Sequence, residues 1–163
     1  MEGSNELTVL AEVSVALAGF SGLVVAVRRG ESSHPWETFR AVALLITGFS
    51  VLLQSLFPFV IHSFGATGPS IWRLSSALGL LMNLAPILPL NRHMPPGFSS
   101  SEYYRLNSTL QLAAVSVAVG AHLANVFALG TEGSFSLFYL GAIINVPMVA
   151  VQFLVVLVAA PRD

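Results

Sequence analysis

The sequence contains no cysteine and no lysine, and only 9% of its 163 residues are charged. Without cysteine the chain can form no disulfide, no thiolate-ligated metal or iron–sulfur centre and no cysteine nucleophile. Without lysine it cannot form a Schiff base, which excludes a retinal protein and a lysine-dependent aldolase. Soluble domains carry about 25% charged residues. A chain that is 9% charged and 55% hydrophobic is therefore predicted to lie in a membrane.

Several functional motifs are also missing. The sequence has no H-E-x-x-H, G-x-S-x-G or P-loop motif, and its only aspartate is Asp163. The net charge is −1 and the basic residues are scattered, whereas nucleic-acid binding needs a basic face. We therefore expect no enzyme activity, no metal site, no cofactor and no nucleic-acid partner.

The apolar residues fall into five runs, each long enough to cross a bilayer as a helix. The connections between the runs are short and rich in turn residues. The sequence predicts an all-α integral membrane protein, a single polytopic domain over residues 1–163. Its five transmembrane helices are expected at residues 7–27, 39–64, 71–90, 106–129 and 135–160. Four crossings would remain if the first run lay in the interface.

The arginines predict the orientation of these spans. One group flanks the first and third connections or follows the last run: Arg28, Arg29, Arg40, Arg92, Arg105 and Arg162. Arg73, at the start of the third run, is the exception. Because arginine-rich connections stay in the cytoplasm, we expect an outside N-terminus, a cytoplasmic C-terminus and a location in the inner or plasma membrane of the cell.

Small residues recur at every fourth position in the first and fourth runs. These two ladders are Ser14, Ala18, Gly22 and Ala26, and Ser116, Gly120, Ala124 and Ala128. Small residues at this spacing let helices approach closely in a membrane. The expected partners are the lipid bilayer and either further copies of the chain or another membrane subunit.

The runs also carry stripes of uncharged polar side chains, including Gln54, Asn83, Asn125 and Asn145. Lipid offers such groups no hydrogen-bond partner, so the stripes should face one another or water. Two interpretations stay open. The stripes either hold the bundle together through interhelical hydrogen bonds, or line a polar pathway.

Glu12 is the one acidic residue well inside a predicted span, and an intramembrane charge is a functional-site candidate. His122 and Asn125 are predicted at a similar depth, which suggests an outward-opening Glu12–His122–Asn125 site. Gln54, Asn83 and Asn145 would support the same ion or proton pathway. Alternatively, Glu12 forms an ion pair with Arg73 or is exposed at the interface.

Three functional hypotheses follow. The leading one is a homo-oligomer that passes a small ion or proton, with a pore between copies lined by the first span and Glu12 as the selecting group. The alternative is a non-transporting binding or scaffold protein for a lipid, a hydrophobic ligand or another membrane subunit. The third is a b-type haem protein in which His62 and His122 are the axial ligands.

Overall fold

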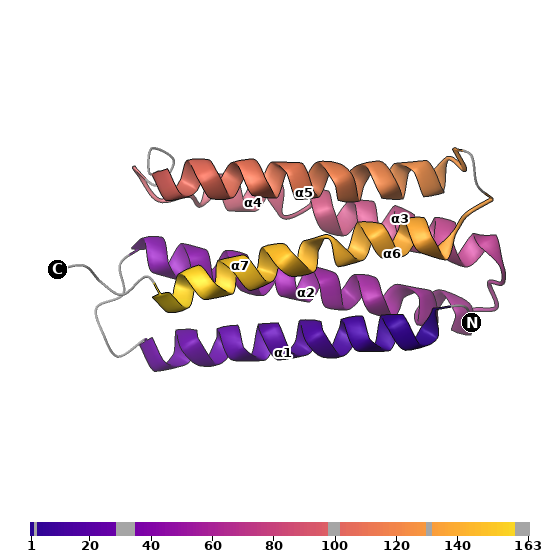
Figure 1. The fold of residues 1–163 in the computed structure, drawn as a ribbon, viewed down its shortest axis with the longest axis horizontal. Helices are drawn as coiled ribbons and strands as arrows, with labels where there is room; N and C mark the ends of the chain where they lie inside the picture. The colour runs from indigo at the N-terminus through magenta and orange to yellow at the C-terminus, as the bar shows by residue number, and fades with distance from the viewer. Residues whose placement is uncertain (2, 29–34, 98–101, 130–131, 159–163) are drawn as a thin grey trace.

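A computed structural model describes residues 1, 3–28, 35–97, 102–129 and 132–158. Within these residues the chain is all-helical and contains no strand. The helices are α1 (Ser4–Arg28), α2 (Pro35–Ser63), α3 (Pro69–Leu84), α4 (Ile87–Arg92), α5 (Glu102–Val126), α6 (Phe135–Ile143) and α7 (Asn145–Val158). They lie side by side along the long axis of an elongated bundle (Figure 1).

Five stretches of the described chain are long and apolar enough to cross a membrane, in agreement with the predicted number of spans. They are Ser4–Leu23, Thr38–Ser63, Pro69–Arg92, Ser108–Val126 and Phe135–Leu154. The third combines α3 with α4, and the fifth combines α6 with α7. The length and composition of these helices are thus compatible with a multi-pass membrane protein.

Prolines divide the third and fifth stretches, which the sequence predicted as continuous spans. Proline has no N–H to donate and its ring crowds the preceding turn. In the third stretch, Ala85 and Pro86 form a turn between α3 and α4. In the fifth, Ile144 separates α6 from α7, and Pro147 cannot donate to the carbonyl group of Ile143. Non-helical backbone at membrane depth is tolerated where protein or a cavity surrounds it.

Helix α2 lies inside the bundle, where it contacts α1, α3, α6 and α7, and α6 and α7 likewise each contact four other helices. In Figure 1, α1 runs along one edge of the bundle, and α5 with α4 runs along the opposite edge. We call the two ends of the bundle the α2–α3 end and the α4–α5 end, after the connection at each. At the α4–α5 end, Trp36 Nε1 donates to the carbonyl oxygen of Pro96 at 3.3 Å, which joins α2 to the segment after α4.

Apolar packing is concentrated in two clusters. Near the α2–α3 end, Leu7, Ile71, Trp72 and Phe138 are buried together. The Trp72 ring lies 5.9 Å from the ring of Phe138, centroid to centroid. The second cluster lies deeper and joins α1, α2, α6 and α7 through Leu10, Leu44, Val51, Ala142 and Val149. Lipid is as apolar as these side chains, so close packing rather than hydrophobic transfer stabilises such contacts in a membrane.

The predicted ladder on α1 is only partly the contact face. Ser14 and Ala18 are buried, but Gly22 is half-buried and Ala26 is exposed. Contact with α2 is closest at Ala18, since a Cβ placed on Gly48 would lie 3.5 Å from the Ala18 Cβ. The buried stripe of α1 therefore follows the natural helical repeat rather than a strict four-residue spacing: Leu7, Leu10, Ser14, Ala18 and Ser21.

The ladder on α5 is not a contact between helices of this chain. Ser116 and Gly120 are exposed, and Ala124 and Ala128 are half-buried. A Cβ on Gly120 would meet nothing within 4 Å. Instead α5 packs through the opposite face, which carries Ala114, Ala118, Ala121, His122 and Asn125. The polar face of α5 is thus the inner one.

Candidate intramembrane polar site

The polar stripes of four spans meet along one line through the bundle, which we call the polar axis. Its members are uncharged hydrogen-bonding side chains. Those that are buried are Gln54 from α2, Ser76 and Asn83 from α3, His122 and Asn125 from α5, and Asn145 and Gln152 from α7. Successive turns of each helix supply these residues, so the axis runs along the helices. The prediction that these stripes face one another agrees with the structure.

Asn125 forms the layer nearest the α2–α3 end. Its Nδ2 donates to Ser76 Oγ at 2.8 Å and to the carbonyl oxygen of Ser134 at 3.1 Å. Its Oδ1 accepts from the Ser134 N–H at 2.7 Å. Ser134 in turn caps α6, where its Oγ accepts from Leu137 N at 3.2 Å. Asn125 therefore ties α5 to α3 and to the start of α6, a structural role.

His122 forms the next layer and is completely buried, with 0% of its surface exposed. Its ring lies between two glycines: a Cβ on Gly79 would come within 2.6 Å of ring atoms, and one on Gly141 within 2.7 Å. The ring Nε2 lies 3.2 Å from Gln54 Oε1. Because an amide oxygen can only accept, a hydrogen bond between these two atoms requires the His122 proton on Nε2.

Two polar atoms of this layer have no hydrogen-bond partner, His122 Nδ1 and Gln54 Nε2. Both side chains are fully enclosed, and the Phe138 ring covers His122 with its centroid 5.8 Å away. We call the Asn125 and His122 layers together the packed half of the polar axis. It is closed by side chains.

Asn83 and Asn145 form a pair in the next layer. Asn145 Nδ2 donates to Asn83 Oδ1 at 3.1 Å. Each asparagine also donates to the carbonyl oxygen of the glycine one turn before it, Asn83 to Gly79 at 2.9 Å and Asn145 to Gly141 at 3.1 Å. These are the glycines that enclose His122. The pair therefore connects the packed half to the region beyond.

Sequence reasoning missed this repeated pattern, although its signal is present. Residues 79–83 read GLLMN and residues 141–145 read GAIIN, so both spans carry glycine and asparagine four residues apart. In a helix this spacing puts both residues on one face. The glycine makes room for the imidazole, and the asparagine bonds to its counterpart.

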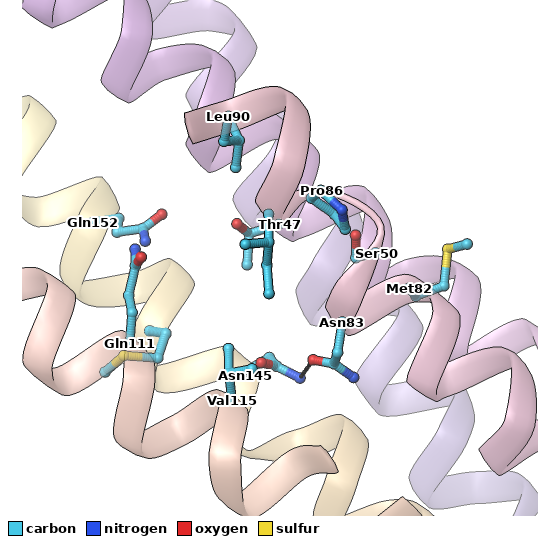
Figure 2. A pocket seen from close by; sticks show the side chains of 12 residues that line it. Thr47, Ser50, Met82, Asn83, Pro86, Leu90, Gln111, Val115, Asn145 and Gln152 are labelled. Atoms are coloured by element: carbon cyan, nitrogen blue, oxygen red, sulfur yellow. Dashed lines mark hydrogen bonds between the residues drawn. The ribbon is translucent and has the colours of Figure 1, made fainter. Parts of the chain in front are cut away.

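Beyond the pair lies a cavity of about 100 Å³, drawn in Figure 2. Its walls come from α2, α3, α4, α5 and α7, and none of the described lining residues has an ionisable side chain. Its polar lining residues are Thr47, Ser50, Asn83, Gln111, Asn145 and Gln152. A water molecule occupies about 30 Å³ of liquid, so the space holds an ion or a few waters. We call these residues the cavity half of the polar axis.

Two hydroxyl groups in the cavity lining already donate their hydrogens to backbone carbonyl oxygens. Thr47 Oγ1 donates to the carbonyl oxygen of Ala43 at 2.8 Å, and Ser50 Oγ donates to that of Ile46 at 2.9 Å. Gln152 is buried, with 6% of its surface exposed, and its Oε1 has no hydrogen-bond partner. Figure 2 shows the Gln152 carboxamide facing the space between Gln111 and Thr47.

Glu12 does not join this site. It is exposed on the outer face of α1, whereas His122 and Asn125 are buried against other helices. The predicted Glu12–His122–Asn125 grouping is therefore not formed within one chain. The reason is topological, because α1 packs mainly on α2 and α7, while α5 packs on α3, α6 and α7.

The alternative ion pair is not formed either. Arg73 is exposed near the start of α3, and among the described residues it makes no ion pair with Glu12. The Arg73 stem instead packs near Gly133, where a Cβ would lie 3.0 Å from Arg73 Cγ. Of the three predicted placements of Glu12, the structure matches the exposed one.

The two histidines predicted as axial haem ligands, His62 and His122, do not lie opposite each other in this structure. His62 is exposed at the end of α2, where its Nδ1 lies 3.2 Å from the carbonyl oxygen of Ala66. Its position is two turns beyond Gln54, the residue that contacts His122. Gly79 and Gly141 leave no room for a porphyrin beside His122. Within the described residues, no group of three or more His, Cys, Asp or Glu side chains could hold a metal ion.

No family model, no curated protein and no solved structure matches this chain. The function must therefore be argued from the site.

Proposed function

We propose that this chain passes a small ion or proton across a membrane along the polar axis inside one helix bundle. The observation that supports the proposal is the alignment of neutral polar residues from four spans, ending in a cavity. Placing polar groups at membrane depth costs free energy unless they are paired or solvated. The cavity half contains groups that the protein itself leaves available, so it suits a transient guest.

In this proposal the two halves of the axis have different tasks. The cavity half holds the passing species, and the packed half is a closed barrier that must rearrange for passage. The side chains of His122 and Gln54 would change position during passage, because each retains an unpartnered polar atom. Species crossing a bilayer in steps are commonly held between such barriers near the membrane midplane.

The orientation and location belong to the same proposal. The arginine asymmetry predicts an outside N-terminus in the inner or plasma membrane. The packed half would then face the outside, and the cavity half would lie toward the cytoplasm. Cysteine-scanning with a membrane-impermeant thiol reagent tests this, since the natural chain has no cysteine.

Flux into proteoliposomes tests the proposal. We expect wild-type protein to carry potassium, sodium or proton current that protein-free liposomes lack. Gln152→Leu should reduce it by at least about tenfold, equivalent to ~1.4 kcal/mol. Leu154→Ala, an exposed position on the same helix, is the matched control and should leave flux unchanged. Absence of flux for all three ions would overturn the proposal.

A second candidate is favoured by the closed packed half. A bundle with a partly open cavity and a fully packed layer beside it suits a membrane protein that binds a small ligand or another subunit without transport. Retained ligand mass in native mass spectrometry, together with no flux, would support this candidate.

A third arrangement is favoured by Glu12. An exposed carboxylate on a spanning helix is costly in lipid, and further copies of the chain would shield it. In this arrangement several copies of the chain surround a pore, α1 lines it, and Glu12 is the group that selects the passing ion. In that case Glu12→Gln would reduce flux and Gln152→Leu would not.

A further inference from the structure

The cavity half contains several oxygen atoms that are available as acceptors to a guest. The hydroxyl hydrogens of Thr47 and Ser50 are donated to carbonyl oxygens one turn away in α2. A hydroxyl whose hydrogen is used can offer only its lone pairs to a guest. Both oxygens therefore act as acceptors toward the cavity.

The two carboxamides of the cavity half that belong to α7 reinforce this bias. Asn145 uses Nδ2 for bonds to Asn83 Oδ1 and the Gly141 carbonyl oxygen, so its free capacity toward a guest is on Oδ1. Gln152 Oε1 is buried without any partner. A buried acceptor without a partner destabilises the fold, and a positively charged guest that contacts this oxygen would remove that cost.

The backbone adds a further acceptor at the same place. Pro86 follows Met82 by four residues and has no N–H, so it cannot donate to the Met82 carbonyl group. Both residues line the cavity. Carbonyl oxygens released by interrupted helices are among the groups with which membrane transporters coordinate monovalent cations.

The charge of the lining bears on the charge of the guest. Divalent cations are held by carboxylates in most protein sites, and none of the described residues that line the cavity carries one. An anion would need N–H donors, and the side-chain amides of Asn83 and Asn145 already donate to protein oxygens. A monovalent cation has the smallest dehydration cost of these ions and is routinely held by neutral oxygens.

We propose that the cavity half is a binding site for a monovalent metal cation, sodium or potassium, held by the oxygens of Thr47, Ser50, Asn145 and Gln152. This deepens the proposed passage by naming the species and rests on it for its biological meaning. Binding itself can be tested without flux. The cavity of about 100 Å³ leaves room for the ion and one or two waters.

The test is the thermal stability of the purified chain in sodium, potassium and choline chloride at equal ionic strength, together with titration calorimetry. A ligand that binds only the folded state raises Tm by mass action. We expect a saturable rise in Tm and a binding heat with sodium or potassium. Choline is a quaternary ammonium ion, so its methyl groups keep oxygen ligands away from the charged nitrogen and it should give neither. The alkali ion with the stronger effect is the preferred species.

Two cavity variants and one matched control sharpen the test. Thr47→Val and Gln152→Leu each remove a ligand oxygen and should weaken binding by at least about tenfold. Thr8→Val removes a hydroxyl with the same local bond, Thr8 Oγ1 to Ser4 O at 2.9 Å, but on the exposed face of α1. It should leave binding unchanged. If Gln152→Leu fails to fold, the near-isosteric Thr47→Val still tests the site.

Equal Tm in the three salts, or a cation response that both cavity variants retain, would overturn the inference. Tighter binding of magnesium than of either alkali ion would do the same. The binding experiment and the flux experiment can fail independently of each other. Cation binding without flux would preserve this site and refute passage, whereas proton flux without cation binding would preserve passage and refute this site.

Discussion

The packed half and the cavity half of the polar axis are built from the same kinds of residue but use them differently. In the packed half, Asn125 forms hydrogen bonds with Ser76 of α3 and with Ser134 at the start of α6. His122 fills the space between two glycines. In the cavity half, hydroxyls bond within their own helix, and Gln152 Oε1 is left without a partner. Buried polar side chains of this chain thus join helices, as at Asn125, or leave an acceptor beside a cavity, as at Gln152, whereas the unpartnered atoms of His122 and Gln54 are enclosed by side chains. The neighbours of each side chain decide which.

The largest effect is expected at Asn125. Asn125→Leu removes the bonds to Ser76 and Ser134 and leaves the Ser134 N–H without its acceptor. Interhelical bonds in membrane proteins average about 0.6 kcal/mol each, with a maximum near 1.7. We expect a loss of about 2–3 kcal/mol of unfolding free energy in detergent. A loss below about 0.5 kcal/mol would mean that the packed half does not depend on this residue.

The next largest effect is expected at the glycines around His122. Gly79→Ala and Gly141→Ala put a Cβ within 2.6 and 2.7 Å of the ring, and overpacking of this kind costs about 1–3 kcal/mol. Thermal melting in detergent measures the loss. Gly120→Ala is the control, since nothing lies within 4 Å of its Cβ position. His122→Ala in the Gly79→Ala background should restore part of the stability, and failure to do so would contradict the ring contact.

A smaller change, of the opposite sign, is expected at Gln152. Gln152→Leu removes a buried acceptor that has no partner. Replacing an unsatisfied group by an apolar one of similar size is neutral or stabilising, by up to about 1 kcal/mol. Equilibrium unfolding in choline chloride measures it without a bound alkali ion. A destabilisation as large as that of Asn125→Leu would show that the two halves do not differ in this way.

The smallest effect on stability is expected at Glu12. The side chain is exposed and makes no ion pair with Arg73 among the described residues. Glu12→Gln should therefore change the unfolding free energy of the single chain by less than about 0.5 kcal/mol. Chemical denaturation at low protein concentration checks this. A larger loss that grows with protein concentration would instead reveal a contact between copies at Glu12.

The number of spans and the inward direction of the polar stripes could be predicted from the sequence. Both follow from local rules, the length of an apolar run and the repeat of a helix. The hydrogen bonds between Asn125 and Ser134 could not be predicted from the sequence, because they depend on which helix ends become neighbours. The same holds for Glu12, whose predicted partners lie on helices that α1 does not reach.

The interruptions of two spans were missed for a different reason. Pro86 and Pro147 were visible in the sequence, but proline is tolerated within many membrane helices. Whether it divides a helix depends on what surrounds the released backbone groups. Here a turn at Pro86 borders the cavity, so the interruption and the cavity belong to one feature. The sequence also repeats glycine and asparagine at 79–83 and 141–145, and this repeat was a local signal for the polar site next to the two interruptions.

The most direct test of the central claim compares Gln152→Leu with Glu12→Gln in the same proteoliposome flux assay. The claim is that passage runs through the interior of one bundle. It predicts that Gln152→Leu lowers flux by at least about tenfold, while Glu12→Gln retains the wild-type rate. The reverse result, loss with Glu12→Gln and full flux with Gln152→Leu, would contradict it and place the route between copies of the chain.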